Sequence, residues 1–277
     1  MDTKKKLYRS KPYIPKEDKA TITQAWQDIL ESGMFIQGKF VTEFENLFAE
    51  LCGTKYAIAT NSGATALEVM IRATGLVGKK ILCPTQTFVA SVSAIERSNN
   101  IPVITDIDPI TQCLNLDIIK DNIDEYTEGV MWVHMGGRIS PDYYEIKQYC
   151  NEMDLVLLED ASHAVGASID RISAGNLGDA GAFSLFATKI ITSGEGGMIT
   201  TNDEKIAEQC RVLRNHGCIR NESPVPGLDF GVTCTVASSN YRMPEMAAAI
   251  GVTQIKRTYQ FVDKRNLLAD RYKEILN

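Results

Sequence analysis

From residue 56 onward, short apolar runs alternate with longer amphipathic stretches along the chain. The runs are typical of β-strands, and the stretches between them show the three- and four-residue spacing of helices. We expect strands at 56–60, 80–83, 102–105, 129–134, 154–158, 181–186 and 197–201. We expect helices near 64–74, 88–98, 115–124, 142–152 and 203–214. This alternation predicts an α/β domain with a mainly parallel sheet. The last strands are too close together for a helix between them, so one of them is predicted to be antiparallel.

Helical periodicity also marks both flanks of this domain. We expect helices over 16–31 and 40–52, and one continuous helix over 242–277 with Pro244 near its start. The chain is therefore predicted to have three parts, namely an N-terminal arm and helix over 1–30, a main domain over 31–240, and a final helix over 241–277. Either that helix leads into a further C-terminal domain, or the protein is unusually short.

The composition narrows the range of partners. The chain is 44% apolar and 23% charged with a net charge of -6, which is ordinary for a soluble globular protein. It has no long basic stripe, so nucleic acid is not expected as a partner, and no apolar stretch approaches the length of a membrane span. The seven cysteines are scattered and form no CxxC pair, so we expect free thiols in a reducing cytoplasm. The three histidines are dispersed, which argues against a zinc site.

A carboxylate and a lysine each stand at the end of an apolar run. Asp160 follows the run 155–158 and Glu159, and Lys189 follows the run 182–186. Pyridoxal 5'-phosphate (PLP) requires these two residue types, because a lysine holds it as a Schiff base and an aspartate keeps its pyridine nitrogen protonated. Each residue also has an ordinary explanation, Asp160 as a helix cap and Lys189 as an exposed strand end. The glycine-rich turn 192–197 favours the functional interpretation, since it would bring the amine back across the sheet edge.

A phosphate site is predicted where the first strand leads into a helix. Gly63 and Ala64 open that helix, and small residues with free amides, together with the hydroxyls of Ser62 and Thr65, form an anion site. An ordinary capped turn would give the same pattern. Ser184, which alternates with apolar neighbours, is also positioned to reach a phosphate.

Three further side chains are candidates for contact with a ligand. Phe88 follows a strand at the edge where α/β sheets bind ligands, and it would either stack on a flat ring or lie in the core. His163 would either contact the ring or satisfy a helix start. Asn240 offers an amide donor just before the last helix, where a capping loop is the alternative.

Taken together, these segments resemble the DegT/DnrJ/EryC1/StrS family of sugar aminotransferases, which are PLP enzymes of fold type I. The resemblance runs from about Ser32 to the end of the chain. Its most specific stretch is EDASHAVGAS…GDAGAFSLFATKIITSGEGGMITTN over 159–202, supported by TNSGATALE, CPTQTFVAS and SNYRMPEMAAAIG. It implies a three-layer α/β/α fold with a mostly parallel mixed sheet, followed in other members by a small C-terminal domain that is largely absent here.

The resemblance also implies roles for individual residues. Lys189 would hold the cofactor as a Schiff base, and Asp160 would bind its pyridine nitrogen. The remaining cofactor contacts within the chain would come from Gly63, Ala64, Phe88, His163 and Ser184. Asn240 would reach the phosphate of a neighbouring subunit's cofactor, which implies a homodimer with shared active sites.

The function implied is transfer of an amino group from L-glutamate to a nucleotide-linked keto-sugar, for lipopolysaccharide or other amino-sugar biosynthesis. One alternative is a PLP-dependent sugar dehydratase of the same fold, in which histidine would replace Lys189. The other is a non-catalytic partner or regulatory protein, which the presence of both Lys189 and Asp160 disfavours. The run 134–138 departs from the His-Leu-Tyr-Gly usual in the family, and the sugar, its aminated carbon and the nucleotide stay open.

Overall fold

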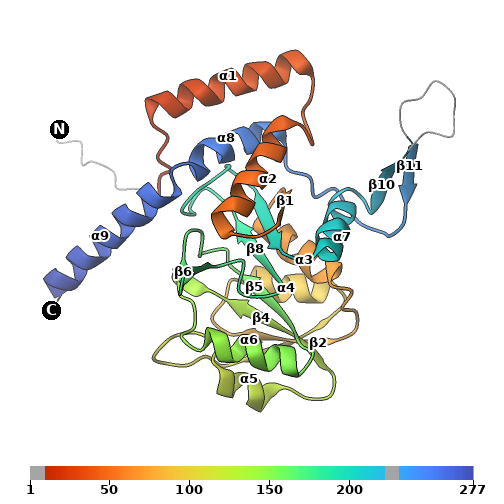
Figure 1. The fold of residues 1–277 in the computed structure, drawn as a ribbon, viewed down its shortest axis with the longest axis vertical. Helices are drawn as coiled ribbons and strands as arrows, with labels where there is room; N and C mark the ends of the chain where they lie inside the picture. The colour runs from red at the N-terminus through yellow and green to blue at the C-terminus, as the bar shows by residue number, and fades with distance from the viewer. Residues whose placement is uncertain (1–9, 222–230, 277) are drawn as a thin grey trace, which may run out of the picture.

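The computed structural model describes residues 10–221 and 231–276. Its centre is a seven-stranded sheet in the order β1-β9-β8-β5-β4-β2-β3 (Figure 1). The strands are β1 (Tyr56–Thr60), β2 (Lys80–Pro84), β3 (Ile101–Thr105), β4 (Thr127–Val133), β5 (Val156–Asp160), β8 (Ala180–Ser184) and β9 (Gly197–Thr201). Neighbours pair in parallel except at β9, which is antiparallel to both β1 and β8. The predicted mixed sheet with one antiparallel strand is confirmed.

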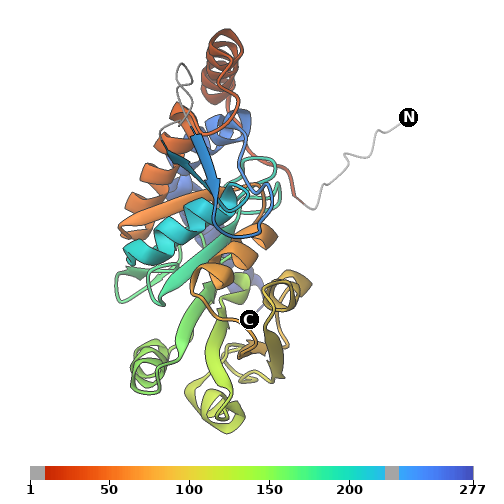
Figure 2. The ribbon, with the colours of Figure 1, turned by 90° about the vertical axis from the view of Figure 1, so that its right-hand side faces the viewer.

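Helices cover both faces of this sheet, as the side view in Figure 2 shows. One face packs against α3 (Gly63–Ala73), α4 (Val89–Arg97) and α7 (Glu204–Arg214). The other face packs against α2 (Lys39–Cys52), α5 (Leu116–Asn122) and α6 (Tyr143–Glu152), with α8 (Glu245–Ile255) lying on α2. The three-layer α/β/α architecture is therefore confirmed.

The central strands are buried from both sides, which explains their unbroken apolar runs. Val130, Met131 and Trp132 on β4 are fully buried although their side chains alternate between the two faces. Parallel strands covered by helices on both faces have this composition. At the sheet edge, in contrast, Ile101 and Ile104 on β3 are about half exposed.

The first helix packs on α8 outside the three layers. α1 (Lys16–Ser32) lies on α8 (Figure 1). The single helix expected over 242–277 is wrong, because the helical chain is interrupted between α8 and α9 (Thr258–Leu276). The buried hydroxyl of Thr258 bonds to the carbonyl of Ile255 there, and Arg257 pairs with Asp18 of α1. These contacts end the buried helix and redirect the chain. The division into three parts at 30 and 240 stays a prediction.

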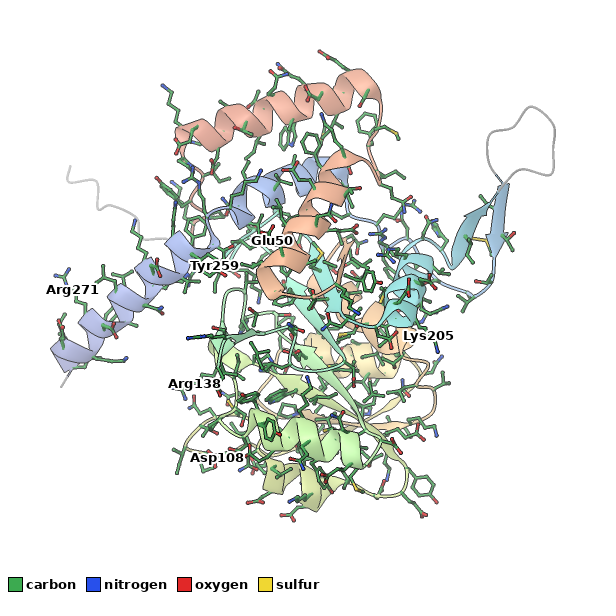
Figure 3. All side chains as sticks on the ribbon, in the orientation of Figure 1. Glu50, Asp108, Arg138, Lys205, Tyr259 and Arg271 are labelled. Atoms are coloured by element: carbon green, nitrogen blue, oxygen red, sulfur yellow. A yellow bond between two sulfur atoms is a disulfide. The ribbon has the colours of Figure 1, made fainter. Side chains whose placement is uncertain are left out.

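Beyond this turn, α9 extends away from the body of the molecule. Figure 3 shows side chains projecting along it from Tyr259 to Arg271, and its apolar residues Leu267 and Tyr272 are well over half exposed. Within the described ranges, no helix is both long enough and apolar enough to cross a membrane.

Short elements that the sequence did not indicate complete the fold. β6 (Ser168–Ile169) pairs with β7 (Ile172–Ser173), and a 3-10 turn η1 covers Met135–Gly137. β10 (Cys218–Asn221) and β11 (Gly231–Cys234) form a hairpin that projects beside α7 (Figure 1).

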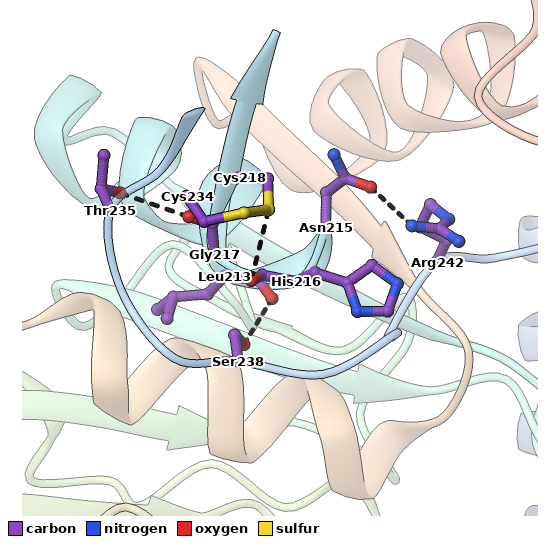
Figure 4. The surroundings of a disulfide bond; sticks show 9 residues. All are labelled: Leu213, Asn215, His216, Gly217, Cys218, Cys234, Thr235, Ser238 and Arg242. Atoms are coloured by element: carbon purple, nitrogen blue, oxygen red, sulfur yellow. Dashed lines mark hydrogen bonds between the residues drawn. A yellow bond between two sulfur atoms is a disulfide. The ribbon is translucent and has the colours of Figure 1, made fainter. Parts of the chain in front are cut away.

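A disulfide joins the two strands of this hairpin. Cys218 and Cys234 face each other across the ladder with their Cα atoms 4.0 Å apart (Figure 4). The expectation that all seven cysteines are free is therefore wrong for this pair, because strand pairing brings together two residues that are 16 positions apart. The other five cysteines are free and buried.

Candidate active site

A pocket of about 800 Å³ opens at the edge of the sheet where the parallel strands end. Its walls come from the residues that follow β1, β2, β4, β5 and β8, the edge where α/β folds bind ligands. The predicted site residues that line it are Gly63, Ala64, Phe88, Asp160, His163, Ser184 and Lys189. Asn240 does not line this pocket.

The start of α3 and the end of β8 meet on one side of the pocket. The first amides of a helix have no partner within the helix, so those of Gly63 and Ala64 are available to an anion. A Cβ atom on Gly63 would lie 2.6 Å from Cβ of Ser184, so only glycine allows the helix start to approach this serine so closely. The hydroxyls of Ser62 and Thr65, expected to face an anion, instead bond to each other and to the helix start as a capping box.

Asp160 is 5% exposed, and each of its carboxylate oxygens accepts a hydrogen bond. The backbone amide of Ser162 donates to Oδ1 (3.1 Å), and the hydroxyl of Ser91 donates to Oδ2 (2.6 Å). Together these two hydrogen bonds hold the carboxylate in one orientation. The last residue of β5 is thus a fixed carboxylate at the pocket wall.

Lys189 lies in a tight turn after β8 that returns the chain toward β9. The hydroxyl of Thr192 bonds to the carbonyl of Leu185 (2.9 Å), and Gly194 adopts the positive φ of 89° that the turn requires. Burial lowers the pKa of the Lys189 ammonium, and the charge of Asp160 offsets part of this effect. The neutral amine, which can act as a base or nucleophile, is therefore more accessible than in an exposed lysine.

His163 lines the pocket, and the charges of Asp160 and Lys189 both act on its imidazole. Burial lowers the pKa of its imidazole, Lys189 lowers it further, and Asp160 acts in the opposite direction. The amide of Gly136 donates to Nδ1 (3.3 Å), so the neutral ring carries its proton on Nε2. The positive φ of Gly136, 64°, allows the η1 turn to make this contact.

Phe88 and Asn240 are both exposed, but only Phe88 lines the pocket. Phe88 is 68% exposed and lines the pocket, which excludes its alternative as a core aromatic. Asn240 is exposed, and its side-chain oxygen accepts from the amide of Arg242 (3.2 Å). It lies in the segment that connects the disulfide-linked hairpin to α8.

Sequence reasoning missed the role of Glu159. This carboxylate is fully buried and accepts hydrogen bonds from His134 Nε2 (2.9 Å) and from the amides of Gly175 (2.7 Å), Leu177 (2.8 Å) and Gly178 (2.7 Å). The available signal was a second acidic residue at the end of a buried strand, since such a carboxylate needs several donors. Ser91, which contacts Asp160, gave no signal of its own.

Comparisons with known proteins agree with this geometry. The sequence profile of the DegT/DnrJ/EryC1/StrS aminotransferase family matches residues 16–277. GDP-perosamine synthase of Caulobacter vibrioides is 37% identical over 243 residues, which are 86% of this chain and 62% of that protein. The chain thus spans less than two thirds of the length of this relative.

Two solved structures share the fold over nearly the whole chain. The Helicobacter pylori aminotransferase PseC, involved in pseudaminic acid biosynthesis, superposes with a TM-score of 0.89 at 27% identity, covering 99% of this chain and 71% of that one. The Escherichia coli GDP-4-keto-6-deoxy-D-mannose-3-dehydratase, with bound hydrated PLP, superposes with a TM-score of 0.85 at 27% identity, covering 94% and 70%. This chain therefore belongs to the DegT/DnrJ/EryC1/StrS aminotransferase family, whose cofactor is pyridoxal 5'-phosphate.

Proposed function

We propose that this chain carries the active site of an aminotransferase that moves an amino group from L-glutamate to a nucleotide-linked keto-sugar, for the synthesis of an amino sugar of a surface polysaccharide. The observation that carries the proposal is the convergence of Lys189, Asp160 and the Gly63–Ser184 contact on one pocket. The Caulobacter relative is named for a GDP-linked sugar, which supports a nucleotide-linked substrate.

The residues present fit PLP in both charge and shape. The start of α3 with the Ser184 hydroxyl suits a phosphate group, and the close approach at Gly63 leaves no room there for a side chain. Asp160 suits a protonated ring nitrogen, and the Lys189 amine suits the aldehyde carbon. Phe88, exposed at the pocket, offers an aromatic face to the ring.

The cofactor, when bound, supplies an electron sink for the bond that is broken at the amino-bearing carbon. In our proposal Lys189 moves the proton, because a partly buried amine of lowered pKa can both accept a proton and return it. Asp160 holds its negative charge toward the ring nitrogen. His163 stays neutral near pH 7, because its pKa is lowered, and can donate a hydrogen bond from Nε2.

We further propose that the enzyme is a cytoplasmic homodimer with shared sites. The support is the position of Asn240, which is exposed and outside the pocket of its own chain, as a residue that serves a neighbouring subunit would be. Two-fold dimers are the commonest assemblies of soluble enzymes. Five of the seven cysteines are free, which suits a reducing compartment, whereas the Cys218–Cys234 disulfide lends this location no support.

The test compares the protein with two lysine variants. After incubation with PLP, borohydride reduction should fix the cofactor to the peptide that contains Lys189, as read by mass spectrometry, and L-glutamate should convert bound cofactor to the amine form. Lys189→Ala should abolish both signals. Lys205→Ala, which changes an exposed lysine on α7 (Figure 3), should retain both. Labelling of Lys189→Ala at an unchanged level would contradict the assignment.

A panel of nucleotide-linked keto-sugars then tests the acceptor. Glutamate-dependent amination of at least one of them is the expected result. A sugar dehydratase would instead leave the amino acid unconsumed, and a regulatory protein would bind PLP without turning over any member of the panel.

A further inference from the structure

Two hydroxyl groups stand in line behind Asp160. Ser91 Oγ lies 2.6 Å from Asp160 Oδ2, and Thr87 Oγ1 lies 2.6 Å from Ser91 Oγ. Ser91 is completely buried, whereas Thr87 is half-buried and lines the pocket. The line therefore runs from the pocket wall, through the protein interior, to the back of the carboxylate.

The chemistry of the three groups fixes the direction of these hydrogen bonds. An ionised carboxylate only accepts, so the single proton of Ser91 must point to Asp160. The hydrogen bond between the hydroxyls must then be donated by Thr87. Every proton in the line is thus directed toward the carboxylate, and this arrangement fixes the orientation of the carboxylate.

Local structure holds both hydroxyls in place. Thr87 directly precedes the N-cap residue of α4 and Ser91 lies in its first turn, and their hydroxyl groups meet there. The amide of Ser91 donates to the carbonyl of Phe88 (3.1 Å), which is the N-cap residue, and the amide of Thr87 donates to the carbonyl of Thr85 (3.0 Å). The segment that presents Phe88 to the pocket therefore also positions the donors to Asp160.

Asp160 forms no ion pair with another described residue, although the charge of Lys189 acts on it at longer range. No described lysine, arginine or histidine lies within ion-pair distance of it, and a carboxylate that is 5% exposed is penalised by loss of water. Its donors are Ser91 and the amide of Ser162. Removing one of two donors to a buried charge is costly.

We propose that Ser91, supported by Thr87, is a positioning residue that keeps the carboxylate of Asp160 aimed at the ring nitrogen of the cofactor. This inference rests on the proposed function, since it assumes that Asp160 pairs with that nitrogen. A purely structural role, in which Ser91 only ties α4 to β5, is the competing explanation.

Ser91→Ala separates the two explanations when binding of two ligands is compared. The readout is the ratio of the dissociation constants for PLP and for an analogue that has carbon in place of the ring nitrogen, because only PLP offers Asp160 a partner. We expect Ser91→Ala to reduce the preference for PLP by about tenfold. Ser91→Thr, which keeps a hydroxyl, should restore most of the preference.

Ser98→Ala is the matched control. Ser98 ends α4, is also buried, and bonds to the carbonyls of Ala94 (2.6 Å) and Glu68 (3.4 Å) without touching Asp160. Its loss should leave the ratio unchanged. Equal weakening of both ligands by Ser91→Ala would overturn the proposal, since a structural tie makes no distinction between them.

If Ser91→Ala does not fold, Thr87→Val removes the donor to Ser91 from a half-buried position, and it should shift the ratio in the same direction. An unchanged ratio in that variant would count against the proposal. Failure of the unaltered protein to bind PLP would instead refute the proposed function, so the two failures are distinguishable.

Discussion

Replacing Glu159 by glutamine should destabilise the protein although the change alters only a few atoms. Oε1 accepts from the amides of Leu177 and Gly178, and Oε2 accepts from the amide of Gly175 and from His134 Nε2. A glutamine can keep only one of these pairs, because its NH₂ group is itself a donor. If the NH₂ group takes the place of Oε1, it faces two backbone amides. If it takes the place of Oε2, it faces one backbone amide and the imidazole of His134, which can switch tautomer and accept from it.

The least costly orientation therefore leaves one backbone amide unsatisfied in a fully buried site. A buried donor without a partner costs about 1–3 kcal/mol, and loss of the charged acceptor weakens the bonds that remain, so we expect a total of about 2–4 kcal/mol. Urea unfolding of the cofactor-free protein, monitored by circular dichroism, measures this difference.

Glu208→Gln is the matched control, since it makes the same chemical change at an exposed position on α7. It should alter the free energy of unfolding by less than about 0.5 kcal/mol. An effect of Glu159→Gln as small as that of the control would refute the reasoning, because it would mean that the four donors find other partners at no cost.

Three other predictions follow from the same geometry. Gly63→Ala should weaken PLP binding by tenfold or more, measured by fluorescence titration, because the new Cβ would lie 2.6 Å from Cβ of Ser184; unchanged affinity would contradict it. Lys189→Met should stabilise the cofactor-free protein at pH 7. Because folding lowers the pKa of this lysine, the unfolded state binds more protons at this group as the pH rises to about 10.4. The destabilising contribution of Lys189 therefore shrinks with rising pH, and the difference in stability between the variant and the unaltered protein should close there in urea titrations; a difference that widens would contradict the argument. Denatured protein should titrate as five thiols when Cys218 and Cys234 are joined and as seven after reduction, and seven without reductant would show that the pair is open.

Most of the central sheet could be predicted from the sequence because its strands are covered on both faces. The bounds expected for β1 and β9, 56–60 and 197–201, are those observed. The antiparallel strand followed from chain length alone, since a parallel connection needs a crossover that the short segment before β9 does not provide.

The hairpin of β10 and β11 was missed because its strands are four residues long and carry exposed apolar residues. Ile219 and Val232 are 45% and 54% exposed, so these apolar residues do not mark a buried strand face of the kind that produces alternation of apolar and polar residues. The disulfide between Cys218 and Cys234 was missed for the same reason, since it depends on the pairing of these strands.

In the site, residues at strand ends were predictable and their supports were not. Asp160 and Ser184 each end a strand, and parallel order brings such ends together at one edge. The amides that donate to Glu159 belong to residues 175–178, and Ser91 contacts Asp160 from α4. No spacing within one segment indicates such contacts, because they depend on how distant segments pack.

The position of β9 also bears on the order in which the protein is assembled during synthesis. Among the described strands, β1 pairs with β9, with Tyr56 opposite Thr201. This early strand therefore cannot pair until residues far along the chain have left the ribosome. α3 follows β1 directly and presents Gly63 to Ser184. A nascent chain that ends before β9 should therefore bind PLP poorly, even though Lys189 has already been made. Contacts between segments so far apart in the sequence also slow folding.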